Sequence, residues 1–282
     1  MAVPLIKIEN ARGEVLNLSA DPRYVPILNG TAPPAATINR AKVSTADGTR
    51  FNSATVGERN LLLTIYIRQD VARARLNLYK YIATKGYIKV YYQADGLDLY
   101  IDGYVETAEV DPWTQDQNMQ VSIICPQPYW RDVSETCTDA SVVSKLFSFP
   151  FTIDSAGVEL SSVDTASGTL VQNNGQVESG IRFEFKATIR SLQPRIYNLG
   201  TGEFIGFYVD MFAGERLVVN TTDGEKSATL IATDGTHKNV LNRFMEGGTW
   251  LKLAPGANEL SYTVDEGEME MRIYHTNMYQ GV

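Results

Sequence analysis

The side chains best suited to chemistry are few in this sequence. It contains two histidines, His237 and His275, and no GxSxG turn that could carry a nucleophilic serine. A serine–histidine–aspartate site would have to use one of these histidines. His275 continues the alternation of Met269, Met271 and Ile273, so we expect it at the end of a buried strand face rather than as a base. His237 follows a turn-like segment, and we expect a solvated loop residue there.

The two cysteines, Cys125 and Cys137, are also poor candidates for chemistry. Two thiols at this spacing form neither a disulfide framework nor a zinc site, and the histidines lie far away in the sequence. We therefore expect two free and mostly buried thiols.

Three aspartates, Asp95, Asp98 and Asp102, resemble a calcium cluster at first sight. Asp98 and Asp102 alternate with apolar residues, however, which predicts an outward strand face, and the closing glutamate of a calcium loop is missing. No GxxxxGK[ST] or GxGxxG loop follows a strand, so no phosphate cradle is predicted. Paired carboxylates for glycoside hydrolysis depend on the fold, and nothing singles out a pair. We assign no catalytic, cofactor-binding or metal-binding residue.

Composition and charge narrow the classes of protein. A chain of 282 residues can bury two cores, and 44% hydrophobic with 21% charged residues is typical of globular proteins. Residues 1–138 hold 15 acidic and 14 basic side chains, whereas residues 139–282 hold 18 and 11. Neither half has the basic surplus that nucleic-acid binding needs. No apolar run of membrane-spanning length and no signal-peptide pattern occurs, so neither membrane insertion nor secretion is expected.

The elements that would position any site are mainly strands. Short strand-like runs broken by turns occupy residues 5–8, 15–18, 24–28 and 37–43. The run Leu61–Ile67 is apolar on both faces, which predicts a strand covered on both sides, with the following helix as one cover.

That helix is predicted to begin at Asp70, a favourable N-cap, and to end at Lys85-Gly86. Its apolar side chains fill an arc of about 200°, wider than packing on one sheet requires. Arg75 lies near the middle of this arc, where a buried guanidinium needs a partner. Either Arg75 snorkels or pairs within its own domain, or the arc serves two surfaces, one of them on a neighbouring subunit. Arg75 is therefore our candidate interface residue, and we predict a carboxylate partner in the same domain or an adjacent subunit. The arc consists of Val71, Ala72, Ala74, Leu76, Leu78, Tyr79, Ile82 and Ala83.

The rest of the chain predicts antiparallel strands in two domains. Residues 86–130 hold two strand pairs, the first closed by the turn Ala94-Asp95-Gly96. A Ser/Thr/Asp-rich stretch then places the domain junction near residues 132–142, which gives domains over 1–135 and 140–282. In the second domain, alternating runs such as Ile181–Lys186 and frequent turn signals favour an antiparallel β-sandwich.

Several segments resemble one known family. IDGYVE and ICPQPYW, after a helix of the form DVARARLNLYKYI, resemble the distal tail protein family of long-tailed, siphovirus-type bacteriophages. In the second domain, GERLVVNTTDGEKSATL, GGTWLKLAPGANELSYTV and RIYHTNMYQGV look like the closing half of that family. The resemblance covers nearly the whole chain and rests on the order of several motifs.

This resemblance implies a mainly β fold: an N-terminal β-sandwich-like ring domain with one α-helix near residues 70–85, and a C-terminal galectin-like antiparallel β-sandwich. It implies a structural virion protein of the tail tip or baseplate, made in the host bacterial cytoplasm. Such a protein forms a homo-hexameric ring that joins the tail tube protein to the tail-associated hub protein and docks receptor-binding or other baseplate proteins. The resemblance implies no enzyme activity and no cofactor.

Two other classes stay open beside this one, an enzyme and a carbohydrate-binding β-sandwich adhesin. A lectin-like module would stack sugars on exposed aromatic side chains, although Trp250 and Tyr262 alternate with core positions and are expected to be buried. Because the acidic residues concentrate in 139–282, we expect the first domain inside the ring and the second outside, where like charges repel less. The aromatic candidates are Trp250, Tyr208, Tyr262, Tyr274 and Tyr279.

Overall fold

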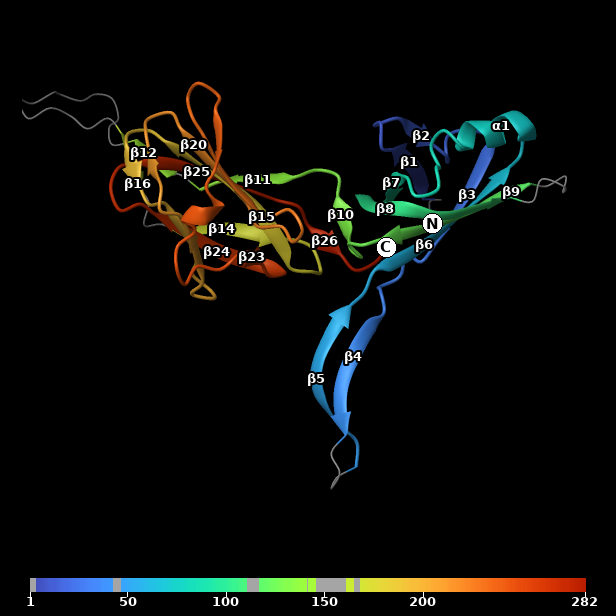
Figure 1. The fold of residues 1–282 in the computed structure, drawn as a ribbon, viewed down its shortest axis with the longest axis horizontal. Coiled ribbons are helices and arrows are strands. Elements are labelled where there is room, and N and C mark those ends of the chain that lie inside the picture. The colour runs from blue at the N-terminus through green and yellow to red at the C-terminus, as the bar shows by residue number, and fades with distance from the viewer. Residues whose placement is uncertain (1–3, 43–46, 111–116, 141, 146–160, 165–167) are drawn as a thin grey trace, which may run out of the picture. The chain divides into compact units, whose positions relative to one another are not determined.

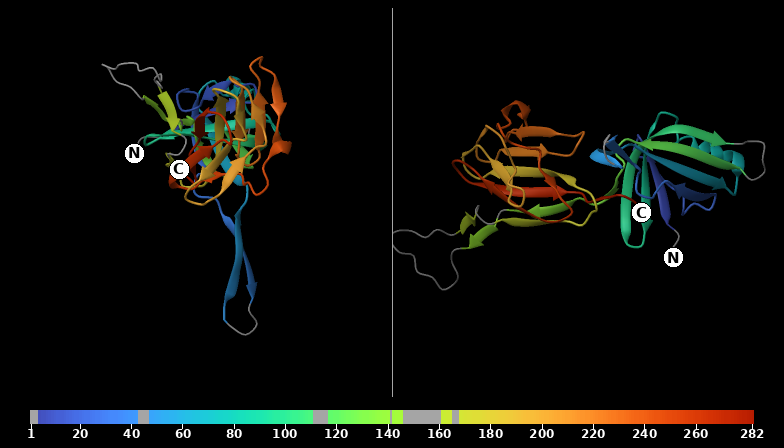
Figure 2. Two further views of the ribbon diagram at one scale, coloured as in Figure 1. Left: turned by 90° about the vertical axis from the view of Figure 1, so that its left-hand side faces the viewer. Right: turned by 90° about the horizontal axis from the view of Figure 1, so that it is seen from below.

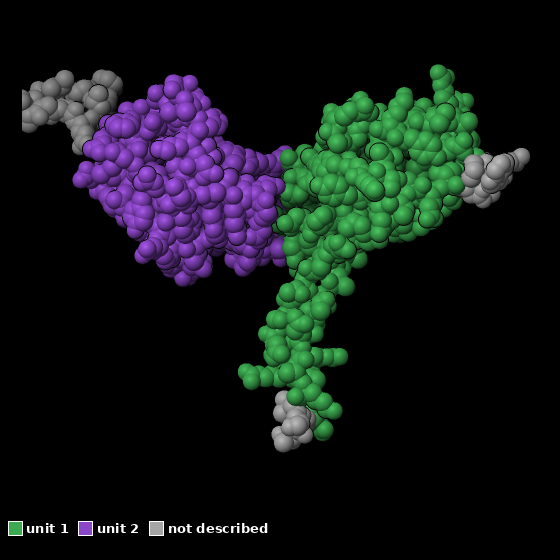
Figure 3. Space-filling model, viewed as in Figure 1, with its two compact units in different colours: residues 1–133, 278–282 green, residues 134–277 purple. Residues whose placement is uncertain are grey.

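The computed structural model describes residues 4–42, 47–110, 117–140, 142–145, 161–164 and 168–282. The chain forms two compact units, coloured green and purple in Figure 3. Unit 1 holds residues 1–133 together with 278–282, and unit 2 holds residues 134–277. Along the described residues, no helix is both long and apolar enough to cross a bilayer.

Unit 1 is built on one antiparallel sheet with strand order β2–β1–β7–β8–β9–β6–β3, to which β10 and β26 add beside β8. A separate hairpin, β4–β5, stands clear of this sheet (Figure 1; Figure 2, left). The elements are β1 (Leu5–Asn10), β2 (Val15–Asn17), β3 (Tyr24–Asn29), β4 (Ala36–Lys42), β5 (Thr49–Val56), β6 (Arg59–Ile67), α1 (Val71–Leu78), β7 (Tyr87–Ala94), β8 (Leu97–Val110), β9 (Asn118–Cys125), β10 (Trp130–Asp132) and β26 (Met278–Tyr279).

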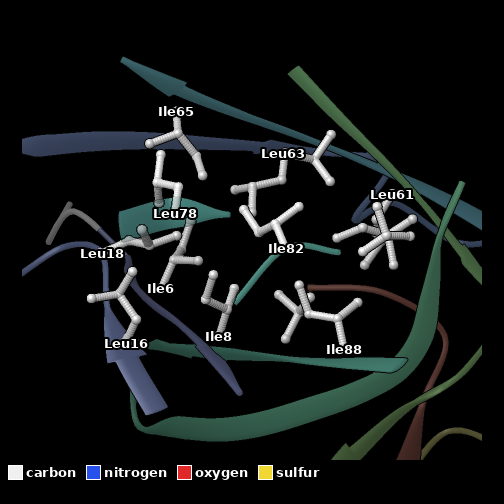
Figure 4. Packing of buried hydrophobic residues seen from close by; sticks show 14 of the residues in the cluster. Ile6, Ile8, Leu16, Leu18, Leu61, Leu63, Ile65, Leu78, Ile82 and Ile88 are labelled. Atoms are coloured by element: carbon white, nitrogen blue, oxygen red, sulfur yellow. The ribbon is translucent and has the colours of Figure 1, made fainter. Parts of the chain in front are cut away.

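The core of unit 1 follows the period-two pattern of its strands. In β6, Leu61, Leu63 and Ile65 are fully buried. Leu78 and Ile82 lie among these residues and the apolar side chains of β1 and β2, which closes the core (Figure 4). The prediction of a strand covered on both sides is wrong, because the second face mixes apolar and hydroxyl groups that tolerate partial exposure. This half-exposed face carries Leu62, Thr64 and Tyr66.

Helix α1 is shorter than the sequence predicts. Asp70 occupies the N-cap position in a left-handed conformation (φ 47°, ψ 46°), without a capping hydrogen bond from its side chain. Beyond Leu78 some backbone hydrogen bonds span three residues instead of four, as between the Tyr81 N–H and the Leu78 carbonyl oxygen (2.9 Å), and the α-helix ends there. The Lys85-Gly86 signal marks a separate turn that leads into β7, not the end of the helix.

Unit 2 is an antiparallel β-sandwich, as predicted. One sheet has the order β11–β25–β15–β20–β21–β22 with β23 beside β15, and the other has the order β14–β24–β17–β18. Phe185 of β15 and Tyr262 of β24 meet in the core between the sheets, with ring centroids 5.9 Å apart. The elements are β11 (Thr136–Asp139), β12 (Val142–Lys145), β13 (Ser161–Asp164), β14 (Thr169–Asn173), β15 (Ser179–Ala187), β16 (Ser191–Leu192), β17 (Arg195–Asn198), β18 (Phe204–Gly206), β19 (Asp210–Met211), β20 (Arg216–Asn220), β21 (Ser227–Ile231), β22 (His237–Asn239), the 3-10 helix η1 (Leu241–Arg243), β23 (Lys252–Leu253), β24 (Gly256–Thr263) and β25 (Met269–His275).

The chain leaves unit 1 after β10 and returns to it at β26. These two strands are antiparallel neighbours, with the fully buried Trp130 opposite Tyr279. The last residues, 278–282, therefore belong to unit 1, whereas the sequence places all of 140–282 in the second domain. Unit 2 is in effect inserted between two adjacent strands of unit 1. The pairing that brings the chain end back is non-local, so local sequence patterns do not reveal it.

Candidate assembly surface

The two histidines do not form a shared site. His275 is buried at the end of β25, where its Nε2 lies 3.1 Å from the Gln172 carbonyl oxygen, and its predicted place on the core stripe is confirmed. His237 is exposed at the start of β22, in a strand and not in the loop that the sequence predicts. Three strands of the sheet separate β25 from β22, so the two imidazoles cannot act together.

The aspartates of β8 serve the sheet itself. Asp102 accepts a hydrogen bond from the Tyr87 hydroxyl on one carboxylate oxygen and a hydrogen bond from the Arg131 guanidinium on the other. Asp95 and Asp98 are exposed, as predicted for a turn and an outward strand face. Within the part of the chain that the structure describes, no group of three or more His, Cys, Asp or Glu side chains is arranged to hold a metal ion.

The two thiols are free but differ in environment. Cys125 is fully buried in unit 1, and burial raises the pKa of its thiol to about 12. Cys137 is exposed on β11, so the expectation of mostly buried thiols holds for Cys125 alone. Cys137 lies opposite the half-buried Tyr274 and not opposite the buried Ile273, so its side chain is on the outer face of the sheet.

The aromatic residues considered for sugar stacking do not share one surface. Tyr262 is a core residue, as predicted, whereas Trp250 is half-buried and not fully enclosed. Tyr208 is about half exposed and Tyr274 is half-buried, and Tyr279 lies in unit 1. The buried Tyr262 is therefore excluded from stacking on a sugar.

The strongest candidate for function is the hairpin of β4 and β5, which we call the arm. Every residue of both strands is exposed. Side chains of directly opposite residues lie on the same face of a hairpin. The register pairs Ala36 with Val56 and Ile38 with Ala54, and these four therefore share one face. The opposite face is polar and carries Thr37, Asn39, Ser53 and Thr55.

A β-bulge adds the largest apolar side chain to the apolar face. Asn39 pairs with Ser53 but Arg40 pairs with Phe51, so Asn52 is the extra residue. Without the bulge, Phe51 would point to the polar face, because a shift of one residue reverses the side of a strand. The register instead places Phe51 opposite Arg40, on the same face as Ile38. The exposed fractions are 53% for Ile38, 61% for Phe51 and 38% for Val56.

The arm is anchored at its root by Arg59, which the sequence analysis did not single out. This guanidinium is 3% exposed and is held by backbone carbonyl oxygens from three segments. Burial lowers its pKa from the ordinary value. Since arginine keeps its charge, the carbonyls must compensate it. Nε donates to Pro128 (2.6 Å), Nη1 donates to Gly30 (2.8 Å) and Ala32 (2.9 Å), and Nη2 donates to Gln280. The sequence does contain a signal for the burial of Arg59, since this residue extends the period-two core face of Leu61 and Leu63.

Helix α1 presents a second uncovered apolar surface. Ala74 and Leu78 face the core, while Ala72, Leu76 and Tyr79 form a stripe at helical spacing that we call the outer stripe. Leu76 is 61% exposed and Tyr79 is 44% exposed. The wide apolar arc of the sequence is thus divided between a buried and an exposed half.

Arg75 lies between these two halves and is half-buried. Its Nη1 donates to the side-chain oxygen of Gln117 (3.1 Å), and its Nε is buried without a hydrogen-bond partner. Among the described residues of unit 1, no carboxylate pairs with Arg75, so the part of the prediction that places one in the same domain is not met there. An amide oxygen takes that place, and it leaves one donor unsatisfied.

Comparison with known proteins gives a family match for unit 2. Residues 174–279 match the family model described as the siphovirus-type tail component, C-terminal domain. No curated protein sequence matches the chain.

Solved structures match over almost the whole chain. The crystal structure of SPP1 Dit, described as a paradigm of the hub adsorption apparatus in phages that infect Gram-positive bacteria, aligns with a TM-score of 0.69 at 12% identity. The alignment covers 98% of this chain and 99% of that protein. Chains of the phage P2 baseplate in its activated conformation, with Ca and with Sr, align with TM-scores of 0.57 at 9% and 10% identity, over 97–100% of this chain and 98–100% of theirs. The predicted fold and the predicted resemblance to the distal tail protein family are both confirmed.

Proposed function

We propose that this chain, a Dit-like component of a siphovirus-type phage tail and hence of the virion, assembles through unit 1 into a ring of six copies. The ring would sit at the distal end of the tail and join the tail tube to the tail-tip hub. Its role is structural: it supplies shape and contacts and needs no cofactor. The likeness of fold to Dit over nearly the full length of both chains supports this proposal.

The single observation that carries the proposal is the uncovered apolar face of the arm. An isolated two-stranded hairpin is at best marginally stable in water, and every residue of this one is exposed. Ile38, Phe51 and Val56 form an exposed apolar row, which marks an interaction site. When an arm on one copy docks on a different surface of the next copy, the contact is heterologous, and repetition around an axis closes a ring.

The outer stripe of α1 is a second contact surface in this proposal. Leu76 and Tyr79 would be covered by the neighbouring copy, which would also bring an acceptor to the half-buried guanidinium of Arg75. A carboxylate suits this position, because it would complement a partly desolvated guanidinium. Replacement of Arg75 by leucine should then weaken assembly more than it destabilises the single chain.

Unit 2 would lie at the periphery of the ring. Residues 139–282 carry 18 acidic and 11 basic side chains, and six copies of this surplus would repel one another in a narrow lumen. An outward position would leave the sandwich free to dock receptor-binding or other baseplate proteins. We propose the same two-part organisation for folding, with unit 2 able to fold as a separate sandwich.

Ring formation is tested by replacing apolar side chains of the arm and measuring the mass of the assembled protein. Phe51→Ser and Ile38→Ser should leave the thermal transition of the single chain almost unchanged, because both side chains are exposed, but should abolish the ring in native mass spectrometry. Leu170→Ser is the matched control: Leu170 is 65% exposed in unit 2, and its loss should not affect assembly. Equal assembly of arm and control variants would refute a role for the arm.

A further inference from the structure

The root of the arm is held by the end of the chain. The arm joins unit 1 through two connections, residues 30–35 before β4 and residues 57–58 after β5. Arg59 follows the second connection, and its side chain binds carbonyl oxygens of Gly30 and Ala32 in the first. One side chain therefore ties the two connections together. Gly30 has φ +84° and approaches the β6 backbone so closely that a Cβ there would overlap a carbonyl oxygen.

The C-terminal tail, Gln280–Val282, completes this arrangement. Gln280 supplies the carbonyl that receives Arg59 Nη2, and the Val282 N–H donates to the Thr31 carbonyl oxygen (3.1 Å). Gly281 packs so tightly on the first connection that a Cβ there would lie 2.8 Å from the Thr31 oxygen. The tail thus contacts the arm's root through a charge-assisted hydrogen bond, a backbone hydrogen bond and close packing.

These contacts decide how freely the arm can move. Neither strand of the arm packs against the main sheet, since every residue of both is exposed. The direction of the arm is therefore set at its root. If the root loosens, the arm samples many directions, and docking must then restrict them at a cost in conformational entropy.

We propose that Arg59 and the tail Gln280–Val282 form a clamp that fixes the direction of the arm for docking on the next copy. Arg59 is a positioning residue in this scheme and makes no contact with the partner. The inference rests on the proposed function for its purpose, but the clamp itself can be measured in a single chain. Because residues 280–282 follow unit 2 in the sequence, the clamp closes only after unit 2 has been made, so a chain that stops before these residues would not present an ordered arm.

The clamp is tested by measuring arm mobility in the full-length protein. Spin labels at Thr49 in the arm and Asp98 on β8, both exposed, report a distance distribution by double electron–electron resonance. Cys137 is first replaced by serine, and labelled chains are mixed with excess unlabelled chain so that only distances within one chain are read. Trp113 and Trp250 are replaced by phenylalanine, so that fluorescence of the buried Trp130 checks that unit 1 stays folded.

Three variants open the clamp in different ways. Gly281→Val dislodges the tail, and a chain ending at Tyr279 lacks the tail. Arg59→Met removes the guanidinium that binds the carbonyl oxygens. Each should broaden the distance distribution and lower the ring association constant by about tenfold, since ordering a freed segment costs on the order of 1.4 kcal/mol. Arg12→Met is the control for loss of an arginine, because Arg12 lies at the surface with its side chain 68% exposed. It should change neither readout.

A narrow distribution in both tail variants, with native Trp130 fluorescence, would overturn the proposal. Those two variants decide the question even if Arg59→Met does not fold. Broad distributions combined with unchanged ring formation would show that the clamp does not serve assembly. If the distribution broadens as expected but the unmodified protein never forms a ring, the proposed function fails and the clamp stands.

Discussion

Excision of unit 2 tests how far unit 1 depends on the end of the chain. We compare two forms of unit 1. The first is residues 1–138, which lacks the tail. The second joins Val133 to Met278 through Asn-Gly and so keeps residues 278–282. Arg131 lies opposite Met278 in antiparallel strands, so this junction makes a short hairpin loop.

The expected difference in stability follows from the contacts that the tail makes. Without it, Arg59 Nη2 loses its acceptor, and a hydrogen bond to a charged group contributes roughly 1.5–3 kcal/mol. Tyr279 and Val282 also pack against the core as partly buried side chains, each contributing on the order of 1 kcal/mol. The sum is about 3.5–5 kcal/mol, a large part of the roughly 5–15 kcal/mol that stabilises a typical domain.

Urea denaturation followed by Trp130 fluorescence, with Trp113 replaced by phenylalanine in both forms, measures this difference. We expect a cooperative transition for the joined chain and a clearly lower midpoint for residues 1–138. The domain bounds predicted from the sequence, 1–135 and 140–282, imply a first domain that folds without residues 278–282, because they do not foresee the return of the tail. Equal midpoints for the two chains would refute the energetic role of the tail, and with it the reasoning on Arg59.

Three further outcomes are expected. Gly30→Ala should lower the thermal midpoint of unit 1 by several degrees, because φ is positive and the added Cβ overlaps a β6 carbonyl, whereas Gly96→Ala, at a similar φ in open space, should cost less. A disulfide reagent at pH 8 should react quickly with Cys137 alone, and with Cys125 only after urea is added, since the buried thiol stays protonated. Burial and Asp102 raise the pKa of the Tyr87 hydroxyl, so the unfolded chain ionises first and the stability of unit 1 should fall above about pH 10 in pH-dependent urea titrations.

Some of these features could be predicted from the sequence because their signals are local. The apolar arc around Arg75 was too wide for one sheet, and the structure divides it into the buried Ala74 and Leu78 and the exposed Leu76 and Tyr79. Strand alternation likewise placed His275 in the core. The end of α1 was predicted too late because Lys85-Gly86 is a turn signal that serves equally well after a helix or before a strand.

Other features depend on non-local contacts and left no such signal. The acceptors of Arg59 are backbone carbonyls, which every residue has, so no residue type marks them. The apolar face of the arm is hidden by the bulge at Asn52, since Phe51 breaks the simple alternation that Ala54 and Val56 follow in the same strand. The return of residues 278–282 to unit 1 depends on strand pairing with β10, which is far away in the sequence.

The central claim is that this chain closes into a ring of six copies, and its mass tests that claim most directly. Native mass spectrometry of the full-length protein over a rising concentration series should show a species of six times the 31.2 kDa chain. Closed oligomers with another number of copies, such as a dimer, should not accumulate. Addition of a chain carrying Phe51→Ser should leave that variant outside the six-copy species. A protein that remains a monomer, or closes as a dimer, at every concentration would contradict the account.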